Sequence, residues 1–298
     1  MTEFHYDAAQ QWVLNLTLAM MVLALDIRPK DFLRVVQTPK APLIGLAAQF
    51  LLLPAFTCLL TLMLDLPAGV ELGMILVAAC PGGALSNFIT HLSGGNTALS
   101  ISITAVSSTV AVVMLPINFV FWAGLNPVAN QLLLEVSVDG FDILKSLLLV
   151  LAVPLLLGFV IQQYFPILAR RLHHVLKYLS LMALVVFILV AVLRNQTHFI
   201  NHFYMLFSVV LAHNALALAI GYFSSRAAGL DLADTKAVTL EVGMQNSSLA
   251  IAIVFTQFNA EYGMALISAF WGIWHIVSGL TFAAACRLKH NNKEKAAL

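Results

Sequence analysis

Charged residues are scarce in this sequence. Of 298 residues only 10% are Asp, Glu, Lys or Arg, against roughly 25% in a typical soluble domain, whereas 61% are hydrophobic. A soluble domain needs charged side chains to cover its surface, so this composition argues against one and indicates a surface that faces lipid. The net charge of +1 shows no excess of basic residues of the kind that binds nucleic acid, and we expect no nucleic-acid partner.

The sequence also lacks the cysteine spacing of a metal or redox centre. Its three cysteines, Cys58, Cys80 and Cys286, all lie in apolar stretches and are not close to one another in the sequence. We interpret them as packing residues. The N-terminus has no basic segment of the kind that begins a cleaved signal, so we expect it to remain part of the mature chain.

Long apolar segments dominate the sequence. A helix needs about 20 mostly apolar residues to cross the hydrocarbon core of a bilayer. Nine segments meet this requirement, and the connections between them are too short for a separate soluble domain. The predicted spans are about 11–27, 42–63, 69–92, 97–123, 142–165, 174–194, 204–225, 233–257 and 262–286. The expected fold class is therefore an all-α polytopic membrane protein with nine transmembrane helices.

Basic residues are distributed unevenly between the two sides of these spans. Only Lys145 and Arg194 fall on one side. The other side carries Arg28, Lys30, Arg34, Lys40, Arg170, Arg171, Lys177, Arg226, Lys236, Arg287, Lys289, Lys293 and Lys295. Because basic loops stay in the cytoplasm, this bias predicts an external N-terminus and a cytoplasmic C-terminus. We expect the plasma membrane, or the inner membrane if the source is bacterial.

Two of the predicted spans contain helix breakers and polar residues. The third reads Cys80-Pro-Gly-Gly-Ala-Leu-Ser-Asn87, where Pro81 lacks an amide hydrogen and the glycines resist helix. The eighth reads Glu241-Val-Gly-Met-Gln-Asn-Ser-Ser248. Open backbone at membrane depth is tolerated only where protein buries it or where it lines a watery cavity. Both segments are therefore candidate sites.

The positions of the two broken spans suggest an inverted repeat. They lie five spans apart, so they cross the membrane in opposite directions, and each has an apolar span on either side. The repeats would be 42–123 and 204–286. In transporters built this way, substrate and ions bind near the midplane where the broken helices meet.

Glu241 is the only carboxylate near the middle of a predicted span. An acidic residue at this depth costs several kcal/mol to insert, and no Lys or Arg lies at the same depth to pair with it. It is therefore a functional candidate. Two interpretations remain open: Glu241 binds a cation, or it is protonated in a carrier driven by H⁺.

Oxygen-bearing side chains accompany Glu241 in two sets. Sodium is a hard cation that prefers carboxylate, carbonyl and hydroxyl oxygens. The first set is Ser86, Asn87, Ser100 and Thr104, of which the last two are four residues apart and share a helix face. The second set is Gln49, Gln245 and the backbone carbonyls freed around Val242 and Met244.

At these residues the chain resembles the bile acid:sodium symporter family. Cys80-Pro-Gly-Gly-Ala-Leu-Ser-Asn87, followed by Gly95-Asn-Thr-Ala-Leu-Ser100 and Thr104, is similar to the signature of the first half. Glu241-Val-Gly-Met-Gln-Asn-Ser247 resembles that of the second half, and Trp274-His275 with Ser278-Gly279 resembles the last span. Many members have ten spans, and this chain resembles a nine-span member.

The resemblance implies a core domain that holds two sodium ions behind crossing broken helices, and a mobile panel domain. By motif position, the first ion would bind Ser86, Asn87, Ser100, Thr104 and Glu241. The second would bind Gln49, Glu241, Val242, Met244 and Gln245. We expect the substrate at Ala84, Leu85, Asn246, Ser247 and His275. Panel helices would come from 1–40 and 138–194, core helices from 41–124 and 204–287, and a cytoplasmic tail from 288–298.

The predicted function is sodium-coupled symport of a small organic anion, a bile-acid-like or other carboxylate or sulfonate, by alternating access. Apart from the two coupling sodium ions we expect no cofactor. The alternative is a proton-coupled organic-anion carrier or a cation/proton antiporter on a similar fold. An enzyme is not expected, because Ser86 has no neighbouring His or Lys at motif spacing. A binding protein without transport would not need paired cation clusters.

Overall fold

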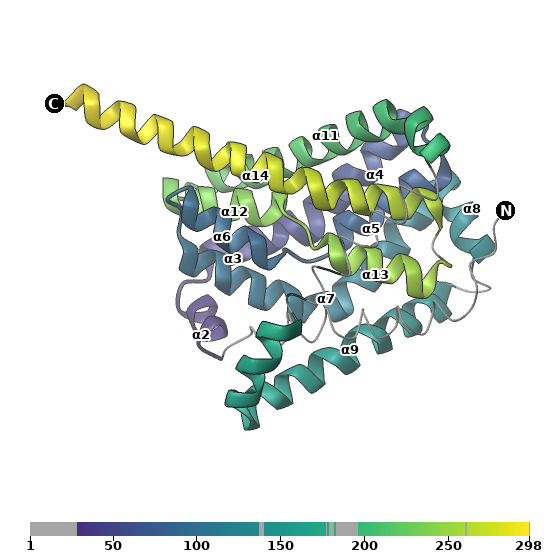
Figure 1. Cartoon of the computed structure of the whole chain (residues 1–298), viewed down its shortest axis with the longest axis horizontal. Helices are drawn as coiled ribbons and strands as arrows, with labels where there is room; N and C mark the ends of the chain where they lie inside the picture. Colours follow the sequence, from purple (N-terminus) through teal and green to yellow (C-terminus); the bar gives the residue numbers. More distant parts are fainter. Residues whose placement is uncertain are drawn as a thin grey trace.

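The computed structural model describes residues 29–136, 140–176, 178, 182, 196–259 and 261–297. These residues are largely helical, and among them the only strand-like feature is one isolated backbone bridge. Figure 1 shows the helices gathered in a bundle, with the end of α14 projecting from it. The helices are α2 Pro29–Gln37, α3 Lys40–Ala47, α4 Leu53–Leu64, α5 Ala68–Ala79, α6 Ala84–Leu92, α7 Thr97–Leu125, α8 Pro127–Val136, α9 Gly140–Tyr164, α11 Gln196–Ala227, α12 Leu232–Gly243, α13 Ser247–Gln257 and α14 Tyr262–Ala297, with a π-helical segment η1 at Ala48–Leu52.

Four continuous helical segments among the described residues are long and apolar enough to cross a membrane. They are Lys40–Leu64, Thr97–Leu125, Phe203–Ala227 and Tyr262–Leu288. Each overlaps a predicted span, which supports a multi-pass membrane protein. The predicted span 11–27 and most of 174–194 lie outside the described residues, so the count of nine stays a prediction.

Both predicted helix interruptions are present. The third predicted span is two helices, α5 and α6, separated by residues 80–83, and the eighth is α12 and α13, separated by residues 244–246. The outer limits of these helix pairs differ from the predicted limits, 69–92 and 233–257, by one residue at most.

Two short helices lie where the sequence analysis placed only connections. Helix α2 precedes the second predicted span, and α8 follows the fourth. Helix α8 begins at Pro127, and the side chain of Asn126 accepts hydrogen bonds from the amides of Val128 and Ala129, both at 3.0 Å. Proline at the first position and asparagine before it are a strong helix start. Helix α14 also continues to Ala297, through the segment expected to be a tail.

The π-helical segment η1 is explained by Pro54, which comes two residues after its end. Pro54 has no amide hydrogen to donate to the residue four positions earlier. The amide of Leu53 instead bonds the carbonyl of Ala48, five residues back. Such π-bulges occur frequently at functional sites. Here the bulge carries Gln49, whose side chain is fully buried.

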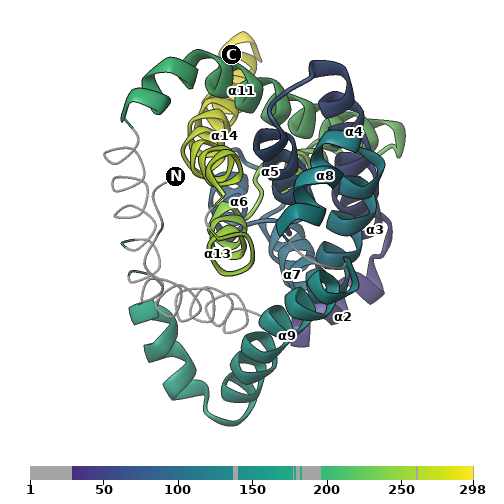
Figure 2. The same cartoon turned by 90° about the vertical axis from the view of Figure 1, so that its right-hand side faces the viewer.

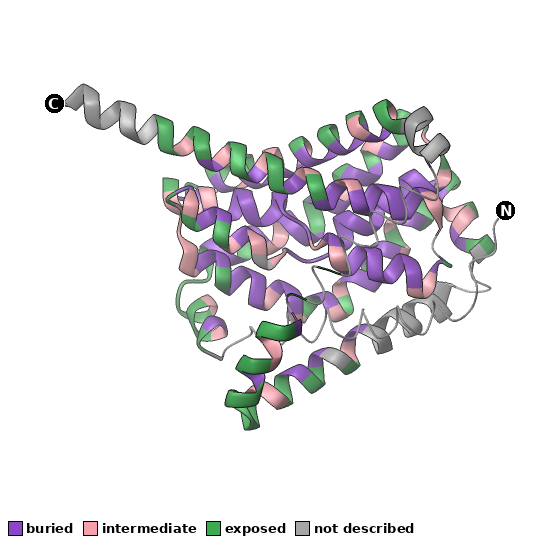
Figure 3. Cartoon of the chain, viewed as in Figure 1, coloured by how far each residue is buried: buried purple, intermediate pink, exposed green. Residues whose placement is uncertain are grey.

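The centre of the bundle is formed by α5 and the end of α12. Every residue of α5 from Gly69 to Ala79 is buried, and α4, α7, α8 and α14 pack around it. Figure 3 shows buried residues through the interior and exposed ones on the outward faces. Many exposed residues are large and apolar, among them Leu51, Met63, Phe121 and Phe223. An apolar exterior of this kind suits lipid.

The turn between α6 and α7 gathers basic residues from three distant segments. Arg34 of α2, Lys236 of α12 and Arg287 of α14 donate to backbone carbonyls within residues 92–98, at 3.1, 2.7 and 2.7 Å. Cations near the C-terminal end of a helix also interact favourably with its dipole. Three segments predicted to lie on the basic side thus meet at one end of the bundle.

Candidate functional site

The two helix breaks lie against each other. The amide of Gly83 donates to the carbonyl of Met244, and the amide of Asn246 donates to the carbonyl of Pro81, both at 2.9 Å. Gly82 and Gln245 form an antiparallel bridge. Each break therefore satisfies backbone groups that the other leaves open, which is how open backbone is tolerated at membrane depth. We call this contact the crossing.

The Glu241 carboxylate is buried at the crossing and surrounded by hydroxyl groups. The hydroxyls of Ser86 and Thr104 each lie 2.6 Å from a carboxylate oxygen, and that of Ser100 lies at 3.1 Å. None of the Lys and Arg side chains that the structure describes is buried. A negative charge on this carboxylate would therefore be stabilised by neutral donors from α6 and α7.

This hydroxyl cage has more acceptor oxygens than protons. Each hydroxyl carries one proton, but each lies close to at least two acceptors besides its own oxygen. Ser86 also lies 2.7 Å from the Gly83 carbonyl. Ser100 and Thr104 both approach the side-chain oxygen of Asn87, at 2.8 and 3.1 Å, and Thr104 also approaches the Ser100 carbonyl at 3.0 Å. The first predicted set is thus brought together around one carboxylate.

The second predicted set lies around the end of α12. The Gln49 amide nitrogen is 3.3 Å from the side-chain oxygen of Gln245, whose own nitrogen donates to the Val242 carbonyl at 2.8 Å. The Met244 carbonyl takes part in the crossing. The Gln49 side-chain oxygen is buried and has no hydrogen-bond partner among the described residues. Such an orphan is unusual in a folded protein, and it suits an oxygen that binds a cation.

The residues expected to bind substrate lie near the starts of α6 and α13. Ala84 begins α6, although its side chain lies outside the described set, and Leu85 packs in an apolar cluster with Ile89 and Met244. Asn246 caps α13: its side chain accepts from the amide of Leu249 at 3.0 Å. Its side chain therefore already has a structural role.

Ser247 and His275 are both buried. A Cβ atom at Gly272 of α14 would lie 2.8 Å from the Ser247 hydroxyl. The His275 ring nitrogen Nδ1 lies 2.6 Å from the carbonyl of Trp271, one turn earlier. A carbonyl only accepts, so Nδ1 carries the proton. Substrate binding by either residue stays a prediction.

Two further residues at the crossing were not predicted. Gly82 faces the Glu241 carboxylate so closely that a Cβ atom there would overlap it. Asn214 of α11 donates to the Gly243 carbonyl at 2.8 Å. A single asparagine inside a long apolar segment was the available signal for Asn214, since a polar residue at membrane depth is a functional candidate.

The donor types at the crossing match a hard cation. Among the described residues, no group of three or more His, Cys, Asp or Glu could hold a metal ion. The crossing instead offers one carboxylate with hydroxyl, amide and carbonyl oxygens. Hard ions such as sodium prefer oxygens of these kinds to imidazole or thiolate.

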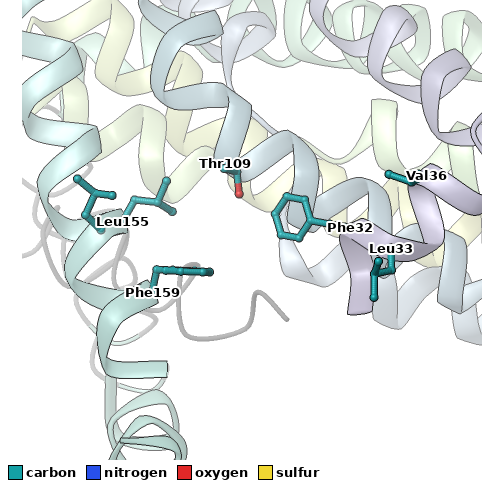
Figure 4. A pocket seen from close by; sticks show the side chains of 7 residues that line it. Phe32, Leu33, Val36, Thr109, Leu155 and Phe159 are labelled. Carbon is teal, nitrogen blue, oxygen red and sulfur yellow. The ribbon is translucent and has the colours of Figure 1, made fainter. Parts of the chain in front are cut away.

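An apolar crevice lies beside α7, further along the helix that carries Ser100 and Thr104. Its volume is about 620 Å³, and Figure 4 shows side chains from α2, α7 and α9 around it. Thr109, on its wall, is five residues after Thr104, or roughly 7.5 Å along a helix. The lining residues are Phe32, Leu33, Val36, Thr109, Leu155, Leu156 and Phe159. The protein thus presents an apolar surface near the polar crossing.

Comparison with known proteins agrees with these features. Residues 13–202 match the Sodium Bile acid symporter family. The Bacillus subtilis protein named "Uncharacterized sodium-dependent transporter YocS" is 31% identical over 296 residues, covering 98% of this chain and 89% of that protein. Arabidopsis thaliana "Probable sodium/metabolite cotransporter BASS1, chloroplastic" is 28% identical over 287 residues, covering 95% of this chain and 68% of that protein.

The "P3 protein" of Bos taurus is 32% identical over 228 residues, covering 73% of this chain and 45% of that protein. The family and the first two relatives are sodium-dependent transporters and not enzymes, which confirms the prediction of a sodium-dependent membrane transporter. The family match covers more than half of the chain, and the bacterial relative aligns with nearly all of it. This chain belongs to the sodium bile acid symporter family.

Proposed function

We propose that this protein is a secondary active transporter that couples the entry of two sodium ions to the uptake of a small organic anion. The observation that carries the proposal is the hydroxyl cage around Glu241. The cage has more close oxygen–oxygen contacts than its hydroxyl groups have protons to place in them. A sodium ion bound by Ser86, Asn87, Ser100, Thr104 and Glu241 would turn these surplus acceptors into ligands.

The second ion would bind at the end of α12. The unpartnered oxygen of Gln49 supports this position, because a buried amide oxygen needs a donor or a cation. Gln245 and the carbonyls of Val242 and Met244 provide further oxygens, and Glu241 would be shared with the first site. Helices α5 and α12 both end at the crossing, so the negative ends of their dipoles favour cations there.

The same crossing suits an anion on its other side. Helices α6 and α13 both begin there, and helix N-termini attract anions. Two sodium ions outweigh the single charge of Glu241, so the loaded site would be positive. The apolar crevice beside α7 supports a substrate that joins a carboxylate or sulfonate to an apolar body. Each net positive charge carried inward would gain about 2.3 kcal/mol per 100 mV of inside-negative potential.

Alternating access would come from movement of the panel against the core. The crevice lies between α7, assigned to the core, and α2 and α9, assigned to the panel. Figure 2, like Figure 1, shows α9 and α11 on opposite sides of the bundle. The hydrogen bonds across the crossing would keep the two broken helices together during such a movement.

Sodium is expected to raise the melting temperature of the purified protein, because a ligand that binds only the folded state stabilises it. At a concentration 100 times its Kd, the gain is about 2.7 kcal/mol. Potassium or choline at equal ionic strength should not reproduce the shift. Tracer uptake into proteoliposomes, with and without a sodium gradient, then tests coupling. Identical melting curves in the three salts, with uptake that follows a pH gradient, would favour the proton-coupled alternative.

The proposed orientation predicts which cysteines an impermeant thiol reagent reaches in intact cells. All three native cysteines would first be replaced, since Cys286 is not fully buried. A cysteine at the exposed position Gln131 should then react from outside, and cysteines at Gln37 and Arg171, also exposed, only after the membrane is opened. If the cysteines at positions 37 and 131 were labelled from the same side, the proposed topology of the spans between these positions would be wrong.

A further inference from the structure

The side chain of Asn214 donates a hydrogen bond to the backbone at the end of α12. It lies on α11, where 1% of its surface is exposed, and its Nδ2 donates to the Gly243 carbonyl at 2.8 Å. Gly243 is the last residue of α12. The last carbonyls of a helix have no partner within the helix, so this bond replaces one that the break removes.

Helix α11 is packed too tightly against α12 for this contact to be incidental. A Cβ atom at Gly243 would overlap the side chain of Leu218, one turn after Asn214. A Cβ at Gly221, further along α11, would come within 2.8 Å of the Thr239 backbone. Glycines at both places let the helices approach closely. The Asn214 amide is therefore presented to the break by a closely fitted helix pair.

The peptide that Asn214 holds lies between two carbonyls assigned to the second sodium ion. The Gly243 carbonyl belongs to the peptide unit that joins Gly243 to Met244, and the units directly before and after it contain the carbonyls of Val242 and Met244. Each peptide unit is planar, so the chain orients a carbonyl only by rotating the whole unit. Fixing the Gly243 unit therefore limits the directions in which the Val242 and Met244 carbonyls point.

The rest of the Asn214 side chain makes a purely structural role a poor explanation. Its Oδ1 is buried and has no hydrogen-bond partner among the residues that the structure describes. A buried acceptor without a partner destabilises the fold, so Oδ1 costs stability while Nδ2 of the same amide satisfies the Gly243 carbonyl. A buried orphan of this kind is unusual in a folded protein, and it suits a side chain whose position serves a function.

We propose that Asn214 is a positioning residue of the second sodium site, which acts by holding the Gly243 peptide so that the carbonyls on either side are oriented toward the ion. This inference rests on the proposed function. It assigns a role in ion binding to α11, a helix on which neither predicted set has a residue.

The test measures sodium affinity without transport. The melting temperature of purified protein would be titrated with sodium at constant ionic strength in choline, and Kd obtained from the dependence. Asn214→Leu keeps the shape and removes the amide. Asn214→Asp keeps the shape and an oxygen but removes the donor to Gly243. Asn118→Leu is the matched control, because Asn118 is a buried asparagine of α7 that bonds Trp122 and not the crossing.

Both Asn214 variants should raise the sodium Kd by roughly 10- to 100-fold, as loss of an outer-shell partner does at other metal sites. Their sodium-free melting temperatures measure separately the stability that is lost with the bond to Gly243. Asn118→Leu should keep its Kd. An unchanged Kd in Asn214→Leu, or a Kd in Asn214→Asp equal to that of the unchanged protein, would overturn the inference. Absence of sodium stabilisation in the unchanged protein would instead overturn the proposed function itself.

Discussion

Replacing Glu241 with alanine is expected to abolish both sodium-dependent uptake and sodium-dependent stabilisation. The carboxylate accepts from Ser86, Ser100 and Thr104, and it is the ligand that both proposed ion sites share. Its loss would remove the only negative charge from a buried cage of neutral groups. Removing an acidic residue also eases membrane insertion, so the variant should reach the membrane. Uptake in proteoliposomes and sodium titration of the melting temperature measure the two effects.

Glu71→Ala is the matched control for this variant. Glu71 is also a buried carboxylate, but it lies in the first turn of α5 and accepts from the amide of Leu66 at 2.9 Å and from Asn126 at 2.7 Å. Its replacement should lower the melting temperature and leave the sodium-dependent shift in place. Sodium-coupled uptake by Glu241→Ala at the level of the unchanged protein would show that Glu241 is not a ligand shared by both sodium ions.

Gly82→Ala should have the second largest effect, although it adds a single methyl group. The new Cβ would overlap the carboxylate of Glu241. Neither partner can easily move, because Gly82 pairs with Gln245 across the crossing and Glu241 is completely buried. We expect the carboxylate to be displaced from its hydroxyl partners and the sodium Kd to rise by about 10-fold or more, measured by the same titration.

Gly83→Ala tests whether the effect of Gly82→Ala comes from this overlap. A Cβ at Gly83 would have no atom closer than 3.7 Å, and its backbone conformation, with φ −97° and ψ 152°, suits alanine. We therefore expect a clearly smaller change in sodium affinity. Equal losses in the two variants would mean that any side chain in the break impairs the site, and the steric explanation for Gly82 would be wrong.

The helix breaks could be predicted because their causes are local. Pro81 cannot donate a backbone hydrogen bond, and two glycines follow it. Three adjacent residues are therefore enough to predict the interruption of the third span. The clustering of polar residues from Glu241 to Ser248 in an apolar span gave the second break in the same way. The oxygen donors of the first set were likewise found as polar residues at membrane depth.

The pairing between distant residues could not be predicted from local pattern. That Ser86 and Thr104 bond the two oxygens of one carboxylate depends on how α6, α7 and α12 pack. The role of Gly82 depends equally on the residue opposite it, Glu241, which lies 159 positions later in the sequence. Helix α2 was missed because the prediction relied on apolar segments long enough to cross a bilayer, and Pro29–Gln37 is shorter than that.

The crossing has a consequence for how the protein is made. It joins residues 81–83 to 244–246, so the ribosome delivers the first break long before its partner. Until then the open peptide groups around Pro81 have no final acceptor or donor, and each unsatisfied group in lipid costs several kcal/mol. Until the eighth span is in place, these peptide groups therefore need hydrogen bonds from water or from a temporary partner. Completion of the eighth span supplies these partners, so a nascent chain that stops before α12 keeps the peptide groups of the first break unpaired.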